Sequence, residues 1–304
     1  MTDFQVAIIG GGPAGLSAAL TLSRSMMRTI VFDSPLPPRN DAARHVGGFP
    51  GMDMASPLQV RERMAEEIRD YGYAQIKSAE ISSAKPDGNG FSLTTQGGSR
   101  FHAKRLLLTT GMVDIFPPIA GLNRLWGTSV INCPFCQGYE FKDRPWGVYV
   151  HRPEILAAAE VYRNWTRDLV LFVDPRIDVP EERAREIEAL DIRIVYGSIE
   201  ALQSSQGALS QVVLRDGSKV DREVLLVWPH QTQCDLVKSL DLPLREGGYV
   251  EIDDCYRTGR KDIYAAGDLT YGGHQNANTA IHMGNMAAAW LVFDLCHTQV
   301  PEPA

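Results

Sequence analysis

The sequence predicts an α/β protein made of two three-layer domains. Three observations predict this class. A strand–helix–strand pattern with closely spaced glycines opens the chain, and a second strand–helix–strand pattern occupies its middle. Near the C-terminus an apolar strand ends in Gly267-Asp268 and precedes a long apolar helix. Because alternating strands and helices favour parallel sheets, the two patterns indicate two α/β units rather than one mixed sheet.

The first glycines have the spacing G-x-G-x-x-G, which is typical of a Rossmann-like dinucleotide-binding unit. Gly10 makes the tight turn, and Gly12 leaves bare backbone that a pyrophosphate can approach. Pro13 and Ala14 open the helix, and Gly15 lets the helix pack closely on the strand. The free N–H groups of the helix start then face the phosphates, so the motif predicts a bound dinucleotide.

The elements around these glycines support that prediction. Val6–Ile9 is an apolar strand, Leu16–Leu22 continues as a helix rich in alanine and leucine, and Thr29–Phe32 is a second apolar strand. Asp33 ends this strand, where a carboxylate accepts hydrogen bonds from ribose hydroxyls.

Composition narrows the class of protein. The 304 residues carry a net charge of −7 without a lysine or arginine cluster, which argues against nucleic acid or an anionic membrane as a partner. No apolar run reaches the length of a membrane span and no secretory signal opens the chain, so we expect a cytoplasmic protein. Five cysteines are too few for a disulfide scaffold, and no second C-x-x-C supplies zinc ligands, so we expect no metal.

Four motifs together resemble the thioredoxin-reductase family of FAD flavoproteins over nearly the whole chain. They are GGGPAG near the start, LLLTTG at 106–111, the C-x-x-C of Cys133 and Cys136, and IYAAGD at 263–268. The resemblance implies FAD as cofactor, a homodimer, and flavin contacts beyond the glycine motif. These further contacts fall on Gly48, Thr110, Gly111, Gly267, Asp268, Gln275, Asn276 and Ala277. The last three stand where the family has Arg-Gln-Ala, so the arginine is missing here.

The resemblance also implies a discontinuous FAD domain with a second domain inserted into it. We expect the FAD domain to comprise residues 1–117 and 244–304, and the inserted domain to comprise 118–243. The linkers would be IFPPIAG and LPLREGG, where proline and glycine cluster. In the family the inserted domain carries the redox cysteines and a second dinucleotide site for NADPH.

That second site is degenerate in this chain. The strand–helix–strand outline persists in the segments GVYV, EILAAAEVYRNW and DLVLFVD. The glycines between the first strand and the helix are absent. His151 and Arg152 put bulk where a pyrophosphate needs bare backbone, Pro153 removes an N–H donor, and Glu154 opposes a phosphate. Tight NADPH binding is therefore not expected, although Arg152 could contact a phosphate in another geometry.

The C-x-x-C pair is the predicted catalytic centre. Pro134 suits a first helical position, which would place the Cys133 thiolate at a helix start that lowers its pKa. The resemblance implies that Cys136 exchanges electrons with the flavin while Cys133 reacts with the outside substrate. Many thioredoxin reductases have an acid after the second cysteine, but this chain has Gln137, which does not titrate.

Another group must then carry protons. His45, His274 and His282 are the candidates, because an imidazole titrates near neutral pH. Glu140, which follows the motif closely, is a weaker candidate.

With the NADPH site degenerate, electrons are expected to enter through sulfur. The chain resembles the small-molecule dithiol oxidases of gliotoxin and holomycin biosynthesis, which close a disulfide in a natural product and pass electrons through FAD to O2, giving H2O2. Two alternatives stay open. One is a thioredoxin or disulfide reductase that is fed by ferredoxin or NADPH, and the other is a flavin-binding redox sensor without turnover.

Overall fold

The computed structural model describes residues 3–297, which group into two compact units. Unit 1 contains the chain up to Arg39, Pro57–Asp114, and the chain from Gln231 onward. Unit 2 contains Asn40–Ser56 and Ile115–His230. Among the described residues, no helix is both long and apolar enough to cross a membrane.

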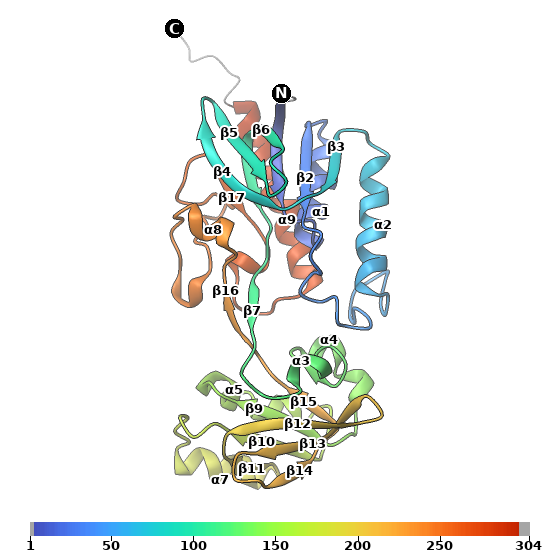
Figure 1. The fold of residues 1–304 in the computed structure, drawn as a ribbon, viewed down its shortest axis with the longest axis vertical. Helices are drawn as coiled ribbons and strands as arrows, with labels where there is room; N and C mark the ends of the chain where they lie inside the picture. The colour runs from blue at the N-terminus through green and yellow to red at the C-terminus, as the bar shows by residue number, and fades with distance from the viewer. Residues whose placement is uncertain (1–2, 298–304) are drawn as a thin grey trace. The chain divides into compact units, whose positions relative to one another are not determined.

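Unit 1 is built on a seven-stranded sheet with the order β3-β2-β1-β6-β5-β4, in which β17 also pairs with β6 (Figure 1). Strands β1, β2, β3, β6 and β17 run parallel, while β4 and β5 add an antiparallel hairpin. The strands are β1 (Asp3–Ile9), β2 (Thr29–Asp33), β3 (Ala74–Ser78), β4 (Ile81–Asp87), β5 (Gly90–Thr95), β6 (Arg100–Leu108) and β17 (Ile263–Ala265). The helices are α1 (Pro13–Arg24), α2 (Pro57–Arg69), α8 (Asp235–Ser239), α9 (Ala277–His297), and the 3-10 turns η2 (Glu246–Gly248) and η3 (Asp268–Thr270).

The alternation of strand side chains creates two cores in unit 1. Val6 and Ile8 point to the face that α1 and α9 cover, where they pack with Leu22 and Leu291. Ala7, Ile9 and their neighbours form the opposite core together with β4, β5 and α8. Helices α1 and α9 approach each other closely because Gly284 has no side chain, and a Cβ there would overlap the Ala14 carbonyl.

Unit 2 has a parallel five-stranded sheet with the order β11-β10-β9-β15-β8 and a three-stranded antiparallel sheet (Figure 1). The parallel strands are β8 (Val130–Ile131), β9 (Trp146–Val150), β10 (Leu169–Val173), β11 (Arg193–Tyr196) and β15 (Val224–Leu226), and the antiparallel ones are β12 (Ile199–Ser205), β13 (Ala208–Leu214) and β14 (Lys219–Asp221). The helices are α3 (Leu122–Leu125), α4 (Pro134–Gln137), α5 (Pro153–Ala157), α6 (Ala159–Tyr162), α7 (Glu181–Ala189) and the 3-10 turn η1 (Tyr139–Phe141). Both faces of the parallel sheet are buried, one against α5 and α6 and the other against β12 and β13.

The expected continuous helix over EILAAAEVYRNW is wrong. The segment forms the two short helices α5 and α6, which meet at Ala158. The amides of Ala158 and Val161 bond three residues back, to Ile155 and Ala158, so the segment tightens there. The five-residue α5 therefore offers a much weaker helix start than the twelve-residue α1.

The chain passes between the units four times, after Arg39, Ser56, Asp114 and His230. Strands β7 (Val113–Ile115) and β16 (His230–Thr232) pair with each other at two of these passages. The grouping differs from the sequence-based boundaries, since the final passage precedes 244 and residues 40–56 group with unit 2. The domain boundaries themselves stay a prediction.

Candidate active site

The glycine motif forms a tight cradle in unit 1. Gly10 has a positive φ of 116°, and a Cβ on it would overlap the Thr109 carbonyl. A Cβ on Gly15 would overlap the Gly10 carbonyl, so α1 starts directly against the end of β1. Pro13 is the first residue of α1, and Ala14 lies in its first turn beside Gly267. These contacts explain why small residues are needed at these positions.

Two observations fit a bound dinucleotide at this cradle. The space beside Gly12 is open, because a Cβ there would meet no atom within 4 Å. The hydroxyl of Thr110, which follows β6, is buried and has no hydrogen-bond partner among residues 3–297; it lies next to Gly111 with its positive φ of 63°. Burying a polar atom without a hydrogen-bond partner costs free energy. A bound ligand would supply that partner.

Asp33 ends β2 as predicted, but its carboxylate is already paired. Arg61 of α2 donates to it and forms an ion pair with it. Because the sequence offers no local signal for this long-range contact, Arg61 was missed. A ribose hydroxyl would share Asp33 with this guanidinium.

The C-terminal residues Asp268 and Gln275, predicted to contact the flavin, lie together in a polar cluster of unit 1. Asp268 follows β17 and Gly267, and Gln275 lies in the loop before α9. Arg39 donates to both the Asp268 carboxylate, at 3.2 Å, and the Gln275 side-chain oxygen, at 2.7 Å. Burial raises the pKa of Asp268, and the Arg39 guanidinium opposes that shift.

The remaining predicted residues of this loop have separate places. Asn276 accepts a hydrogen bond from the Thr279 amide at 2.9 Å, so its side chain caps α9, which begins at Ala277. His274 lies exposed in the loop before α9, and His282 lies exposed on α9. Their predicted role in proton transfer stays a prediction.

The two cysteines of the C-x-x-C motif form a disulfide in unit 2. Cys133 follows β8 and is the N-cap of α4, whose first residue is Pro134, as the sequence predicted. The Cα atoms of Cys133 and Cys136 lie 5.3 Å apart. The Cys133 sulfur accepts a hydrogen bond from the Cys136 amide at 3.1 Å. An amide aimed at this sulfur would stabilise a Cys133 thiolate once the disulfide opens.

The residues that follow the disulfide are fixed by packing. The Gln137 side chain is buried and donates to the Gly127 carbonyl at 3.4 Å, so it serves structure rather than proton transfer. Gly138 lies against Trp165, where a Cβ would collide with the indole. Phe135 packs edge-on against the same indole at 5.3 Å. Phe135 and Tyr139 are nevertheless 62% and 72% exposed, so aromatic surface flanks the disulfide.

A histidine–glutamate pair lies close to the disulfide within unit 2. His45 and Glu140 approach to 3.5 Å, and both are largely buried. Gly47, two residues after His45, lies so close to Cys136 that a Cβ would overlap the Cys136 carbonyl. Gly48, the predicted flavin contact in the same segment, has a φ of 72° and bonds Asp53 through its amide. The fold thus joins two proton-carrier candidates that are far apart in the sequence.

Aromatic side chains gather at the end of β9, where the sequence predicts a degenerate nucleotide cradle. The imidazole of His151 stacks on Tyr149 at 4.9 Å and meets the His230 ring edge-on at 5.5 Å. Burial lowers the pKa of His151. These rings occupy the end of β9, where glycines would leave room for phosphates. A pyrophosphate at this position would have to displace them.

Asp174, the acid that follows β10, already has hydrogen-bond partners within unit 2. Asp174 accepts hydrogen bonds from the Tyr149 hydroxyl at 2.9 Å and from Arg176 at 2.8 Å. The Arg176 hydrogen bonds are the main reason that the pKa of Asp174 falls to about 2. Burial, aided by Asp174, raises the pKa of Tyr149 to about 12. Arg176, the basic residue that follows this strand, is therefore paired with its neighbour Asp174.

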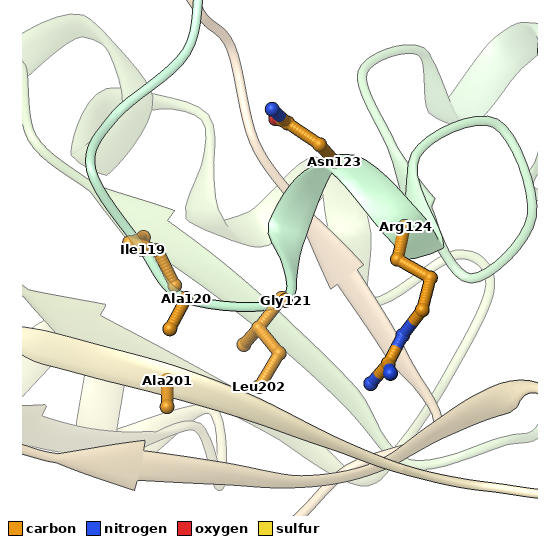
Figure 2. A pocket seen from close by; sticks show the side chains of 7 residues that line it. All are labelled: Ile119, Ala120, Gly121, Asn123, Arg124, Ala201 and Leu202. Atoms are coloured by element: carbon orange, nitrogen blue, oxygen red, sulfur yellow. The ribbon is translucent and has the colours of Figure 1, made fainter.

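Unit 2 also has a shallow hollow of about 510 Å³, shown in Figure 2. It is lined by Ile119, Ala120, Gly121, Asn123, Arg124, Ala201 and Leu202. Arg124 donates to Ser204 at 3.0 Å. None of the lining residues belongs to the predicted site, so the hollow plays no part in the chemistry considered below.

Comparisons with known proteins agree with the fold and the motifs. The model of the pyridine nucleotide-disulphide oxidoreductase family matches residues 4–161 and 167–284. The thioredoxin reductase tcpT of Claviceps purpurea is 29% identical over 310 residues, covering 95% of this chain and 94% of that protein. The thioredoxin reductase sirT of Leptosphaeria maculans is 28% identical over 283 residues, covering 87% and 86%.

Solved structures confirm the predicted fold class. A putative thioredoxin reductase TrxB from Bacillus anthracis has a TM-score of 0.91 at 28% identity, covering 97% of this chain and 100% of that one. The structure of HlmI has a TM-score of 0.89 at 28% identity, covering 97% and 93%. The sequence-based recognition is likewise confirmed. The chain belongs to the pyridine nucleotide-disulphide oxidoreductase family and is a thioredoxin-reductase-like redox enzyme within it.

Proposed function

We propose that this protein is an FAD-dependent dithiol oxidase that closes a disulfide in a small-molecule dithiol, with dioxygen as the electron acceptor. The observation that carries the proposal is the contrast between the two cradles. The cradle of unit 1 has open space beside Gly12 and an unsatisfied Thr110 hydroxyl. The equivalent place in unit 2 carries the rings of Tyr149, His151 and His230 in mutual contact and has no glycine motif.

This contrast argues against a nicotinamide cofactor as the electron source. A nucleotide would have to displace a ring stack and take Arg176 away from Asp174. It would gain little in return, because α5 has five residues, lacks the Pro153 amide and carries Glu154 in its first turn. Reducing equivalents then enter as thiols.

Thiol exchange at the cysteine pair moves two electrons. One substrate thiolate attacks the Cys133 sulfur, the Cys133–Cys136 bond breaks, and the Cys136 thiolate leaves. The second substrate thiolate attacks the substrate sulfur of this mixed disulfide and releases the Cys133 thiolate. The substrate loses two electrons and two protons, and the cysteine pair gains the electrons. FAD held at the cradle of Gly10, Gly12 and Gly15 would supply the two-electron chemistry that couples these electrons and two protons to O2, giving H2O2.

We assign proton handling to His45 and Glu140. Both substrate thiols must lose a proton before they attack, and Gln137 cannot accept one. His45 offers an imidazole, and its neighbour Glu140 can orient the ring. The Gly47–Cys136 approach keeps this segment beside the disulfide.

Replacing His45 by glutamine is therefore expected to lower kcat by about 10² to 10⁴-fold, the usual range for loss of a general base. Glu140→Gln should cause a smaller loss and shift the pH profile of kcat/KM, since it removes the partner of the imidazole. Steady-state kinetics from pH 5.5 to 9 would measure both effects. His297→Gln, an exposed change at the end of α9, is the matched control. An unchanged pH profile in both variants would remove the pair from proton transfer.

The exposed aromatic side chains support a small apolar substrate. Phe135 and Tyr139 together place two exposed rings beside the disulfide, and such rings bind flat apolar or amide surfaces. Their exposed faces would orient a compact dithiol over the Cys133 sulfur.

The direct test is aerobic turnover of a panel of cyclic and linear dithiols, followed by oxygen consumption and peroxide formation. The proposal expects one H2O2 for each disulfide formed, over many turnovers. A reductase would instead reduce disulfides when supplied with reduced ferredoxin or NADPH. A redox sensor would stop after a single exchange.

A further inference from the structure

Arg39 donates hydrogen bonds to three side chains around the predicted flavin residues. Its Nε donates to Asp114 at 2.7 Å. Its NH1 donates to Asp268 at 3.2 Å and to Gln275 at 2.7 Å. These partners come from β7, from the turn η3 that follows β17, and from the loop before α9. One side chain therefore joins three segments that are far apart in the sequence.

The partners of Arg39 also accept hydrogen bonds from a neighbouring side chain, Gln231. Gln231 donates to Asp114 at 3.1 Å and to Gln275 at 2.9 Å. Tyr249 donates in turn to Gln231 at 3.1 Å. The side chain of Asp114 is only 5% exposed, so this is an interior network rather than a surface ion pair. In such surroundings a partner removed from the network leaves a buried polar group unsatisfied.

The charges of the network make Arg39 its critical member. Two carboxylates, Asp114 and Asp268, approach the one guanidinium. Burial raises the pKa of Asp268, the Asp114 charge raises it further, and the nearby Arg39 lowers it. Without the cation, the buried Asp114 and the partly buried Asp268 would face each other without a compensating charge.

We propose that Arg39 is a positioning residue of the flavin site, which fixes the Asp268 carboxylate and the Gln275 amide for FAD. Arg39 acts through these two residues rather than by touching the reacting sulfur atoms. The proposal rests on FAD as the cofactor in the proposed function, but it is independent of the substrate and of O2. It also gives a role to a residue outside every motif that the sequence displayed.

A double-mutant cycle on FAD affinity tests the proposal. Apoprotein would be prepared for the wild type, Arg39→Met, Asp268→Asn and the double variant, and the Kd for FAD would be measured by flavin fluorescence. Arg39→Met is expected to weaken FAD binding at least about tenfold, the effect of one charge-assisted hydrogen bond. In the Asp268→Asn background the same change should have little further effect, because the carboxylate that Arg39 positions is gone.

Two further variants separate positioning from a general loss of stability. Arg39→Lys keeps the charge and should recover part of the affinity, whereas Arg63→Met removes an exposed arginine of α2 and should leave it unchanged. Equal losses from Arg39→Met in both backgrounds would overturn the proposal, as would wild-type affinity in Arg39→Met. If Arg39→Met does not fold, the cycle runs with Arg39→Lys. Wild-type protein that binds FAD but lacks oxidase turnover would sink the proposed function alone.

Discussion

Replacing Cys133 by serine is expected to abolish dithiol oxidation while the protein keeps its flavin. A serine hydroxyl cannot form the mixed disulfide, and it is a far weaker nucleophile and leaving group than a thiolate. Cys136→Ser should have the same effect, because the disulfide between the two sulfurs is the oxidant that the substrate meets. The cysteines belong to unit 2 and the glycine cradle belongs to unit 1, so neither change replaces a residue of the cradle.

The measurement is peroxide formation per enzyme, together with the ratio of FAD to protein in each purified variant. Cys296→Ser is the matched control, because this cysteine is free and exposed on α9. It should leave both values at the wild-type level. Peroxide formation at the wild-type rate in either the Cys133 or the Cys136 variant would exclude the pair from the reaction.

The second large effect is expected at Gly12. Valine there should leave the apoprotein folded but remove FAD, because its Cβ meets no protein atom within 4 Å and enters the space reserved for phosphates. The backbone at Gly12, with φ −79° and ψ −175°, is an extended conformation that valine adopts without strain.

Gly15→Val makes the comparison sharp. A Cβ at Gly15 overlaps the Gly10 carbonyl, so this variant should lose stability in the apoprotein as well. Thermal unfolding of both apoproteins and their FAD content would be measured side by side. A Gly12→Val protein that retains full FAD, or one that unfolds as readily as Gly15→Val, would contradict the assignment of the cradle.

Local patterns were sufficient to predict the fold class and the local geometry of the glycine turn and of the cysteine pair. The glycines at 10, 12 and 15 act through the backbone of one turn, and Cys133 and Cys136 act through a single helical turn. These features depend on residues that are adjacent in the chain, so they can be predicted from one sequence. The degenerate second cradle was predicted for the same reason, since His151 and Glu154 stand inside the motif that they replace.

Contacts between distant segments could not be predicted in this way. Nothing near Arg39 in the sequence indicates that it reaches Asp268, and nothing near His45 indicates Glu140. Both contacts depend on the path by which long loops return to the sheets. The hydrogen bond from the Tyr149 hydroxyl to Asp174 links the ends of neighbouring strands. It depends on the register in which β9 and β10 pair.

The helix after β9 illustrates a third limit. Alanine-rich EILAAAEVYRNW has the propensity of one continuous helix, yet it forms two short ones. Ile155 and Leu156 of α5 and Ala159 and Tyr162 of α6 are all buried in the same core. Packing of these side chains on the sheet therefore decides the local path of the backbone, and propensity is overridden.

The most direct measurement is anaerobic reduction of the bound flavin, with NADPH and a small dithiol added in separate experiments. A dithiol should bleach the flavin absorbance within the turnover time, and NADPH at millimolar concentration should leave it oxidised. Rapid bleaching by NADPH would contradict the conclusion that the rings of Tyr149, His151 and His230 close the second nucleotide site.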